Sequence, residues 1–252
     1  MNENNMRKKT ALVTGASSGL GKQTAICLAK AGFDVAISAR RVDRLKDLAG
    51  ELISYGVQAL PVAMDVRERS SIRDGIKFIG EELAAIDVLI NNAGVSVTKR
   101  PEDYDDDDFD FVMETNFNGP WFCAQEVGRA MIRRGEGGKI VNIASMVGLR
   151  PIGKLAIYGA SKAALIHLTK ALAMEWARHD IQVNAICPGY IETEMNTEFW
   201  RSEGGETFMK TFPRGRVGQP DAMDGAIRLL TGDDSEFITG AILSVDDGQI
   251  FM

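Results

Sequence analysis

Lys9–Gly21, with the sequence KTALVTGASSGLG, decides the fold class of this chain. Lys9–Gly15 is apolar and β-branched and predicts a buried strand, and an amphipathic pattern through about Ala31 predicts a helix after it. Between them, glycines stand at positions 15, 19 and 21. Such glycines let the backbone turn tightly and approach a pyrophosphate, which amide groups at the helix N-terminus can hold. An ordinary turn needs one of these glycines, so three of them favour a nucleotide site.

The same alternation of strand and helix continues along the chain. Further strands are predicted at 33–38, 57–64, 86–90, 139–144, 181–186 and 241–245, and helices at about 41–52, 70–83, 106–134, 157–178 and 221–230. This order predicts an α/β fold, a Rossmann-type doubly wound and mainly parallel seven-stranded sheet with helices on both faces. We expect a tail over residues 1–8 and a single domain over residues 9–252.

The composition limits the classes of partner. The chain has 252 residues, enough for one α/β domain with a buried core, and its net charge of −6 argues against nucleic acid or an anionic membrane. It has no run of eighteen apolar residues, and its first ten residues lack the apolar core of a secretory signal. Three scattered cysteines fit reduced thiols, so we expect a cytoplasmic protein. Because only two histidines are present, we expect no metal site.

The end of the second strand bears on the choice of nucleotide. An NAD site usually has an acidic residue there to bind the ribose hydroxyls. This chain has Ala39, followed by Arg40 and Arg41, and Asp43 falls in the first turn of the next helix, where acids are common. Guanidinium groups pair with phosphate bidentately, so the two arginines favour the 2′-phosphate of NADP over NAD. The alternative is that they are ordinary surface arginines.

Polar residues also follow other predicted strands, at the edge where open α/β sheets bind ligands. Asp65-Val66 follows the third strand, where a carboxylate could accept a hydrogen bond from an adenine amino group. Asn92–Gly94 follows the fourth, although this sequence is also ordinary turn chemistry. Asn116 lies inside a predicted helix, where asparagine is mildly unfavourable, and this indicates a role for it.

Tyr158 and Lys162 stand at i and i+4 near the start of a predicted helix, so both project from one face. Tyrosine, with a pKa of about 10, is a poor acid or base at neutral pH. A nearby ammonium group favours the phenolate and lowers that pKa into the working range. Taken alone, the pair is an ordinary helical contact. Ser145 stands at the end of the fifth predicted strand, upstream of the pair, and the rest of the chain decides between an ordinary contact and a shared site.

The motifs follow one another in the order and spacing of a known family. They are TGASSGLG at 14–21, NNAG at 91–94, Asn116, Ser145, Tyr158-x-x-x-Lys162, Pro188-Gly189 and Val245-Asp246-Asp247-Gly248. With them the chain resembles the short-chain dehydrogenase/reductase family over nearly its whole length, and within it the NADP-linked reductases of carbonyl and 3-oxoacyl compounds. It departs from the family at Asp247, where many relatives have glycine.

The resemblance implies a role for each matched residue. Tyr158 would protonate the carbonyl oxygen during reduction and act as the base in reverse, while Lys162 would lower its pKa and hold the nicotinamide ribose. Ser145 would stabilise the substrate oxygen, and Asn116 would hold a water that relays protons toward Lys162. The residues implied in cofactor binding are Gly15, Ser17, Ser18, Gly19, Leu20, Gly21, Arg40, Arg41, Asp65, Val66, Asn92, Ala93, Gly94, Tyr158, Lys162, Pro188, Gly189, Ile191 and Thr193.

The implied activity is NADPH-dependent reduction of a ketone, of carbonyl or 3-oxoacyl type, to a secondary alcohol by reversible hydride transfer. Two alternatives remain. One is an NAD-linked alcohol dehydrogenase working in the oxidative direction, and the other is a catalytically silent NADP-binding protein on the same fold. The resemblance also implies a homotetramer, which the wide apolar faces of the helices at 106–134 and 157–178 favour.

Residues 194–220 interrupt the alternation of strand and helix, and from this irregular stretch we predict a lid over the substrate at about residues 190–216. The apolar residues of this stretch are Met195, Phe199, Trp200, Phe208, Met209 and Phe212. They favour an apolar ketone or ketoacyl group and a lid that orders on binding, although they could instead pack the segment onto the core. The basic residues Arg201, Lys210, Arg214 and Arg216 leave room for an anionic tail, such as that of a thioester carrier.

Overall fold

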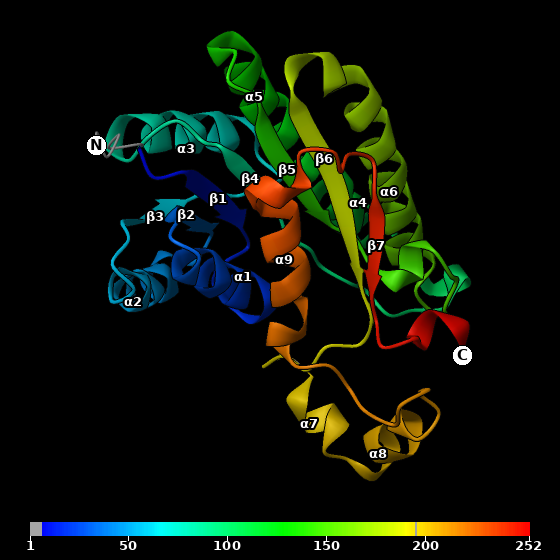
Figure 1. Ribbon diagram of the computed structural model, residues 1–252. Helices are drawn as coiled ribbons and strands as arrows, with labels where there is room; N and C mark the ends of the chain where they lie inside the picture. Colours follow the sequence, from blue (N-terminus) through cyan, green and yellow to red (C-terminus); the bar gives the residue numbers. More distant parts are fainter. Residues whose placement is uncertain (1–6, 195) are drawn as a thin grey trace.

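A single parallel sheet organises the fold (Figure 1). The computed structural model describes residues 7–194 and 196–252, so Met195 and most of the expected tail lie outside the described residues. The strands are β1 Thr10–Thr14, β2 Asp34–Ala39, β3 Ala59–Ala63, β4 Val88–Asn91, β5 Gly138–Ile143, β6 Ile181–Pro188 and β7 Ile242–Val245. Their order is β3-β2-β1-β4-β5-β6-β7 and every pairing between them is parallel. The predicted seven-stranded, doubly wound α/β fold is confirmed.

Helices cover both faces of this sheet. They are α1 Gly19–Lys30, α2 Val42–Ile53, α3 Arg69–Glu82, α4 Asp106–Met113, α5 Gly119–Arg134, α6 Ala156–Trp176, α7 Thr197–Trp200, α8 Glu203–Met209 and α9 Asp224–Thr231. Side chains such as Leu28, Leu45 and Ile227 from α1, α2 and α9 form the core on one face. Ile72 from α3 and Met131 from α5 belong to the core on the other face, together with part of α6. The chain reverses its direction of winding between β1 and β4, and this places the ligand-binding edge there.

The predicted long helix 106–134 is interrupted at its centre. A π-helical turn, Glu114–Asn118, separates α4 from α5. Pro120 contributes to this interruption because it has no N–H and cannot make the α-helical bond to the carbonyl of Asn116. The expectation of one regular helix was therefore wrong, and Asn116 lies in the wide turn rather than in an α-helix.

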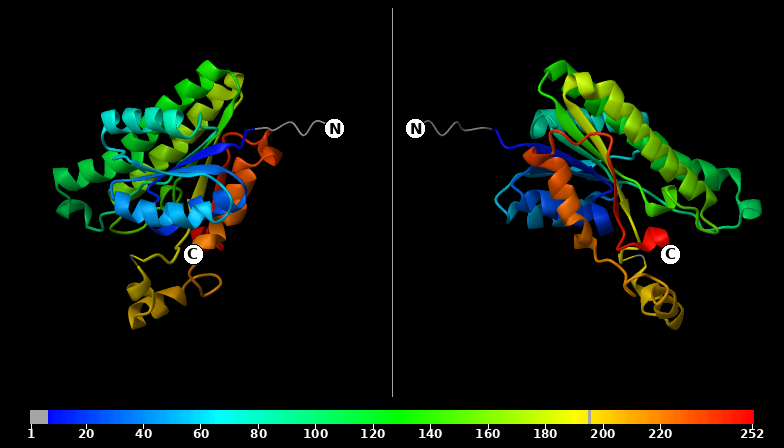
Figure 2. Two further views of the ribbon diagram at one scale, coloured as in Figure 1. Left: turned by 90° about the vertical axis from the view of Figure 1, so that its left-hand side faces the viewer. Right: turned by 45° about the vertical axis from the view of Figure 1, so that its right-hand side comes forward.

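The segment 190–216 leaves the body of the molecule beyond the carboxyl ends of β6 and β7. Both views in Figure 2 show α7 and α8 apart from the sheet and its covering helices. The rings of Trp200 and Phe212 are 5% and 4% exposed, and they pack with Tyr190 and Phe208 at centroid distances of 5.1–6.3 Å. The segment thus contains two short helices and a small aromatic core of its own.

No helix within residues 7–194 and 196–252 has the length and apolar character needed to cross a lipid bilayer.

Candidate active site

The residues predicted for the site gather at one edge of the sheet. Ser17–Gly21 follow β1, Arg40 and Arg41 follow β2, Asp65 and Val66 follow β3, Asn92–Gly94 follow β4, Ser145 follows β5, and Gly189, Ile191 and Thr193 follow β6. Tyr158 and Lys162 reach the same edge from the first turns of α6. The gathering follows from the topology, because the carboxyl ends of parallel strands lie together.

The glycine-rich loop packs too closely against its neighbours to accept side chains. Gly15 has φ +67°, and a Cβ there would lie 2.8 Å from the Cα of Ala93. A Cβ on Gly21 would lie 2.4 Å from the carbonyl oxygen of Gly15 and from Nδ2 of Asn92. Asn92 fixes the loop by donating from Nδ2 to the carbonyl of Thr14 at 2.9 Å. Backbone groups therefore line this part of the edge, as a pyrophosphate site requires.

Arg40 and Arg41 are both exposed beside this loop. Nη2 of Arg41 donates to Oγ of Ser17 at 3.4 Å, which links the end of β2 to the glycine-rich loop. Ala39, the last residue of β2, has no carboxylate, but the Asp65 carboxylate after the neighbouring β3 is close enough for the charge of Arg40 to help lower its pKa. These two guanidinium groups could hold a phosphate on the ribose of a dinucleotide.

Asp65 and Val66 are arranged differently from the sequence expectation. The carboxylate of Asp65 accepts from Nε and Nη2 of Arg67 at 3.4 and 3.2 Å, and from the Arg67 backbone N–H at 3.0 Å. Burial raises the pKa of Asp65, but the bonds from Arg67 outweigh it and leave that pKa below its usual value. The Val66 side chain is buried against Gly119. An adenine would therefore share the Asp65 carboxylate with Arg67.

Lys162 and Ser145 are buried beneath the open edge, with 4% and 7% of their surfaces exposed. Nζ of Lys162 donates to the carbonyl of Ile143, the last residue of β5, at 2.8 Å, and it lies 5.8 Å from the Tyr158 ring centroid. Oγ of Ser145 accepts from the backbone N–H of Val147 at 3.1 Å. The i, i+4 pair thus faces one site, where β5 supplies the acceptor for its lysine and the residues directly after β5 supply the serine.

The pKa shifts at this site differ from the sequence expectation. Burial raises the pKa of Tyr158, and a hydrogen bond with Ser145 opposes the rise. Burial also lowers the pKa of Lys162 from its ordinary 10.5 to about 8. We expected the ammonium group to lower the tyrosine pKa, but burial is the largest cause of the pKa shift in both groups.

Asn116 is fully buried, and its side-chain amide is committed to the protein. Oδ1 accepts from the backbone N–H of Val95 at 2.8 Å, and Nδ2 donates to the Val95 carbonyl at 2.9 Å and to Oγ of Ser161 at 3.1 Å. Ser161 in turn donates to the carbonyl of Tyr158 at 2.7 Å. The side chain therefore holds the loop after β4 against the start of α6, a role that the sequence pattern did not reveal.

Cys187 is a neighbour of the site that the sequence motifs do not include. It is fully buried near the end of β6 and accepts a hydrogen bond from the backbone N–H of Ser145. Burial raises the pKa of its thiol to about 11, so it stays protonated at neutral pH. Its position directly before Pro188-Gly189 is the one sequence signal that could have identified it.

The segment after β6 closes the edge on the side of the glycine-rich loop. A Cβ on Gly19 would lie 3.4 Å from Cγ2 of Thr193. Ile191 pairs with Gly218 in an isolated parallel bridge. A Cβ on Gly189 would lie 2.5 Å from Oε1 of Gln249, so the turn after β7 packs directly on this position.

Two parts of this edge have features that a dinucleotide would require, namely the glycine-rich loop after β1 and the region above Lys162. Gly94 is exposed, and a Cβ there would lie 3.4 Å from Nζ of Lys162, so the glycine leaves space open above the lysine. Gly94 follows β4 at the same edge as the glycine-rich loop, so a nicotinamide half above Lys162 and a pyrophosphate half at the loop would lie along one edge of the sheet. Histidine, cysteine, aspartate and glutamate side chains do not gather in metal-binding groups anywhere in residues 7–194 and 196–252.

Comparison with known proteins agrees with this geometry. Residues 9–204 match the short chain dehydrogenase family. The chain is 38% identical to an NAD-dependent glycerol dehydrogenase of Listeria innocua over 97% of this chain and 94% of that protein. It is 38% identical to a gluconate 5-dehydrogenase of Gluconobacter oxydans over 94% and 93% of the two chains.

A solved structure shares both fold and sequence with this chain. The gluconate 5-dehydrogenase of Burkholderia cenocepacia, in complex with NADP and tartrate, aligns with a TM-score of 0.91 and 36% identity, covering 97% of this chain and 96% of that one. Family match, relatives and structure agree, so this chain belongs to the short-chain dehydrogenase family and is an NAD(P)-dependent oxidoreductase.

Proposed function

We propose that this enzyme catalyses the reversible, NADP-linked reduction of a ketone to a secondary alcohol. The observation that carries the proposal is the lysine buried beneath the open edge of the sheet, with Ser145 and Tyr158 beside it. Burying an ammonium group destabilises the folded protein unless the group is paired and hydrogen-bonded. Among the described residues, Lys162 donates one hydrogen bond, to the Ile143 carbonyl. Perturbed titratable groups of this kind mark functional sites.

Each residue has a distinct task in this proposal. The raised pKa keeps the Tyr158 hydroxyl protonated, so it can give its proton to the carbonyl oxygen during reduction. Ser145 donates a hydrogen bond to the same oxygen and stabilises the charge that develops there. Lys162 places a positive charge near the phenolate that Tyr158 becomes after it gives up its proton. When bound, NADPH supplies the hydride.

Asn116 acts in this proposal through its surroundings. Its side chain holds Val95 and Ser161, and so sets the loop after β4 relative to Tyr158. The water expected at Asn116 would then be held by its backbone carbonyl, because Pro120 provides no N–H as the α-helical donor to it. Replacing Asn116 would therefore disturb the site by moving backbone as well as by losing a water.

The preference for NADP rests on Arg40 and Arg41. Arg41 already contacts Ser17, so the two arginines and the glycine-rich loop could enclose a 2′-phosphate together. The relatives include examples with each cofactor, because the glycerol dehydrogenase is named as NAD-dependent and the gluconate 5-dehydrogenase structure contains NADP. Cofactor choice is therefore a property to measure on this chain.

The substrate class depends on the segment 190–216, which we propose to be a lid. Its rings pack mainly on one another, so their apolar surface is only partly available to a substrate. Phe199 packs on Trp200 at a ring-centroid distance of 4.9 Å but is still 49% exposed, so it is the aromatic residue of α7 with the most surface available to a substrate. We therefore propose a ketone of moderate size, with an apolar group that reaches this residue, as the substrate.

A second candidate, a polyhydroxylated or carboxylated ketone, is favoured by Arg150. This half-buried arginine lies five residues after Ser145 and close enough to Tyr190 to oppose the rise that burial causes in the tyrosine pKa. Its charge could pair with a substrate carboxylate. The names of the relatives, a gluconate 5-dehydrogenase and a glycerol dehydrogenase, support this candidate.

One assay separates these candidates. The loss of reduced nicotinamide absorbance would be followed with NADPH and NADH against alkyl ketones of rising chain length and against keto acids of sugars. Higher kcat/KM with longer alkyl chains supports the apolar class. A preference for sugar acids that Arg150→Gln reduces supports the carboxylated class. No turnover of any carbonyl, and no oxidation of the matching alcohols, would refute the proposed reaction.

We also propose that the enzyme is a homotetramer. Large apolar side chains are exposed on several helices and near the chain end, among them Phe109 on α4, Met174 on α6, and Phe237 and Phe251 on either side of β7. Such surface is usual at subunit contacts and uncommon on a monomer. Light scattering at micromolar concentration would give a mass about four times that of one chain, and a monomer mass would refute this.

A further inference from the structure

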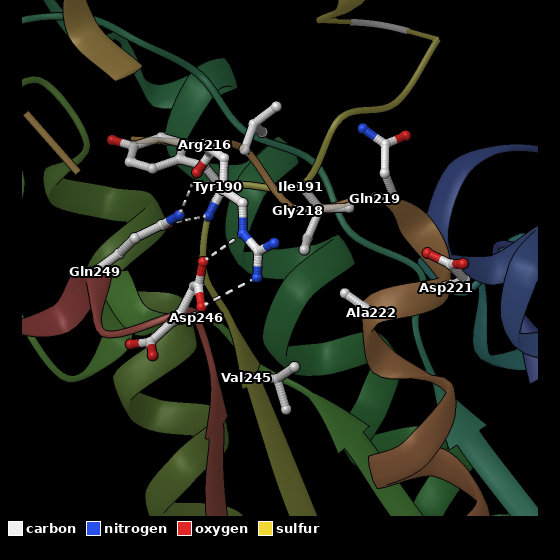
Figure 3. Close-up of a pocket in the computed structure, with 12 residues that line it drawn as sticks. Tyr190, Ile191, Arg216, Gly218, Gln219, Asp221, Ala222, Val245, Asp246 and Gln249 are labelled. Atoms are coloured by element: carbon white, nitrogen blue, oxygen red, sulfur yellow. Dashed lines mark hydrogen bonds and ion pairs between the residues drawn. The ribbon is translucent and has the colours of Figure 1, made fainter. Parts of the chain in front are cut away.

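The turn Asp246–Gln249, directly after β7, contacts both ends of the segment 190–216. We call Tyr190–Thr193 the outgoing limb and Pro213–Gln219 the return limb. Oε1 of Gln249 accepts from the backbone N–H of Tyr190 at 2.7 Å, and Nε2 donates to the carbonyl of Arg216 at 3.4 Å (Figure 3). Because Gln249 is 2% exposed, its amide is a fixed bridge between the two limbs.

Asp247 adds a charged connection to the return limb. Its carboxylate accepts from Nη1 of Arg214 at 2.9 Å and from Nε and Nη2 of Arg216 at 2.8 and 3.5 Å. These bonds lower the pKa of Asp247, with Arg216 the largest cause, so the carboxylate stays ionised at neutral pH. A single side chain thus holds two arginines at the base of the segment.

The backbone conformation at Asp247 is one that normally favours glycine over aspartate. Its φ is +53°, in the left-handed region that glycine adopts freely and other residues adopt with strain. The left-handed conformation continues at Gly248, with φ +84°. A residue with a carboxylate therefore stands where the backbone favours glycine, and its two arginine contacts are what glycine could not make.

The same turn also reaches the chemical site. The carbonyl of Gln249 accepts from Nη1 of Arg150 at 3.3 Å, on the loop that begins at Ser145. Gly189, directly before the outgoing limb, packs against Asp246 and Gln249 with no room for a Cβ. A cavity of about 440 Å³ lies between the turn, the two limbs and Ala222, so the limbs have space to move when their contacts with the turn break.

We propose that Asp247 is a positioning residue that holds the return limb and so fixes the segment 190–216 in its position for binding substrate. The inference rests on the proposed role of this segment as a lid. Exposed ion pairs are individually weak, but a bidentate arginine and a second arginine on one carboxylate restrain the limb together. Because the three side chains are accessible to solvent, salt weakens the restraint.

The test compares two Asp→Gly variants at matched backbone conformations. Asp247→Gly removes the ion pairs at a position where glycine fits without strain. Asp180→Gly makes the same change at φ +56°, in the turn before β6 at the opposite edge of the sheet. Asp247→Asn, which also tolerates this conformation, serves as a second variant that keeps the side-chain shape and removes the charge.

The first measurement needs no turnover. A glutamate-specific protease has exposed sites at Glu198, Glu203 and Glu206 that all variants retain. We expect Asp247→Gly and Asp247→Asn to be cut there about three- to tenfold faster than the parent protein at low salt, and Asp180→Gly to be cut at the parent rate. Near 1 M salt, where the Debye length is about 3 Å, the parent rate should approach that of the variants.

The second measurement uses the carbonyl substrate that the parent enzyme turns over best. We expect its KM to rise about three- to tenfold in Asp247→Gly with kcat changed less than about twofold, because the variant alters positioning and leaves the reacting groups intact. Cleavage rates equal to those of the parent would overturn the proposal. Faster cleavage with unchanged KM would also overturn it, since the turn would then be merely structural. If the parent reduces no carbonyl, the proposed reaction fails, while the cleavage result still decides the role of Asp247 in holding the segment.

Discussion

Lys162 and Trp200 are almost equally buried, with 4% and 5% of their surfaces exposed, yet different parts of the molecule bury them. Lys162 lies among β5, α6 and the loop after β4, which are joined by long-range hydrogen bonds. Trp200 lies among Tyr190, Phe208 and Phe212, all within the segment 190–216. The lysine is therefore fixed by the whole domain, and the tryptophan by its own neighbourhood.

The difference separates two tasks. The groups that we propose to move protons must keep their relative positions, and they lie on or next to strands and helices that share the main core. The segment 190–216, which we propose to be a lid, would have to move to admit and enclose substrate, and a small core of its own lets it move as one unit. The segment is joined to the body by contacts that include the turn Asp246–Gln249 and the exposed ion pair of Arg44 with Glu194. We expected a lid that orders on binding, whereas the segment already has helices and a core.

The largest effect should come from removing the hydroxyl of Tyr158, which we propose to be the proton donor. Tyr158→Phe removes the hydroxyl and little volume, so we expect kcat to fall by about 10²–10⁴-fold. NADPH binding, followed by nicotinamide fluorescence, should stay close to that of the parent protein because the ring remains. If more than about a tenth of the parent kcat survives, the assignment of Tyr158 as the acid is wrong.

A second variant tests whether the buried ammonium group of Lys162 lowers the free energy of unfolding. Lowering the Lys162 pKa from 10.5 to about 8 corresponds to at most about 3 kcal/mol of destabilisation at pH 7. Lys162→Met removes that charge and loses one hydrogen bond to Ile143, so we expect a gain of roughly 1–2 kcal/mol in the free energy of unfolding of the ligand-free protein.

The pH dependence gives the sign of this effect. Between about pH 8 and 10.5 the folded parent protein releases the Lys162 proton while the unfolded chain keeps it. The stability of the parent therefore rises with pH in this window, and the advantage of Lys162→Met should shrink there. Urea unfolding of both proteins at pH 7 and pH 10 measures it. A methionine variant that is less stable at pH 7 would contradict the proposed cost of the buried ammonium.

The arginines after β2 offer a third test, which measures cofactor preference. If Arg40 and Arg41 hold a 2′-phosphate, kcat/KM should be about ten- to a hundredfold higher with NADPH than with NADH. The double variant Ala39→Asp with Arg40→Ala should reverse the order, because a carboxylate would then meet the ribose hydroxyls. Arg44→Gln on α2 is a matched control that should leave the preference unchanged. Equal kcat/KM for both cofactors in the parent enzyme would refute the NADP interpretation.

Much of the site at the edge of the sheet could be predicted, because the order of the strands brings its residues together. Ser145, Tyr158 and Asn92 are far apart in the sequence, but each stands at the end of a predicted strand or the start of a helix, and parallel topology brings these points together. The pKa of Tyr158 could not be predicted in this way. The direction of the Tyr158 pKa shift depends on how deeply the fold buries the hydroxyl, and the spacing of residues in the sequence does not reveal that burial.

The structure of the segment 190–216 was harder to predict from the sequence. Its helices are short, four and seven residues, so hydrophobic periodicity has little length in which to show itself. The same aromatic residues could have packed on the main core, on a substrate or on one another, and only the fold decides among these. The contact of Asp247 with Arg214 and Arg216 spans more than thirty residues and has no motif.

The smallest expected change in global stability comes from the segment's own core, and it tests the comparison most directly. Trp200→Ala removes the ring at its centre, whereas Leu165→Ala removes a side chain of similar burial from α6 in the body. A buried leucine replaced by alanine costs about 2–5 kcal/mol, so Leu165→Ala should lower Tm by roughly 5–15 °C. If the segment folds as a separate unit, Trp200→Ala should lower the Tm of the body by less than about 2 °C, because the segment would already be open when the body unfolds.

In the same Trp200→Ala variant, the segment 190–216 should nonetheless unfold locally. We expect cleavage at Glu203 and Glu206 to be at least tenfold faster in Trp200→Ala, and KM for the ketone to rise, while Leu165→Ala leaves the cleavage rate near that of the parent below its own Tm. Phe199→Ala, at a ring 49% exposed in the same segment, should change cleavage far less. A Tm drop in Trp200→Ala as large as that in Leu165→Ala would mean that the two regions share one cooperative core, because only then would a cavity in the segment be felt by the sheet.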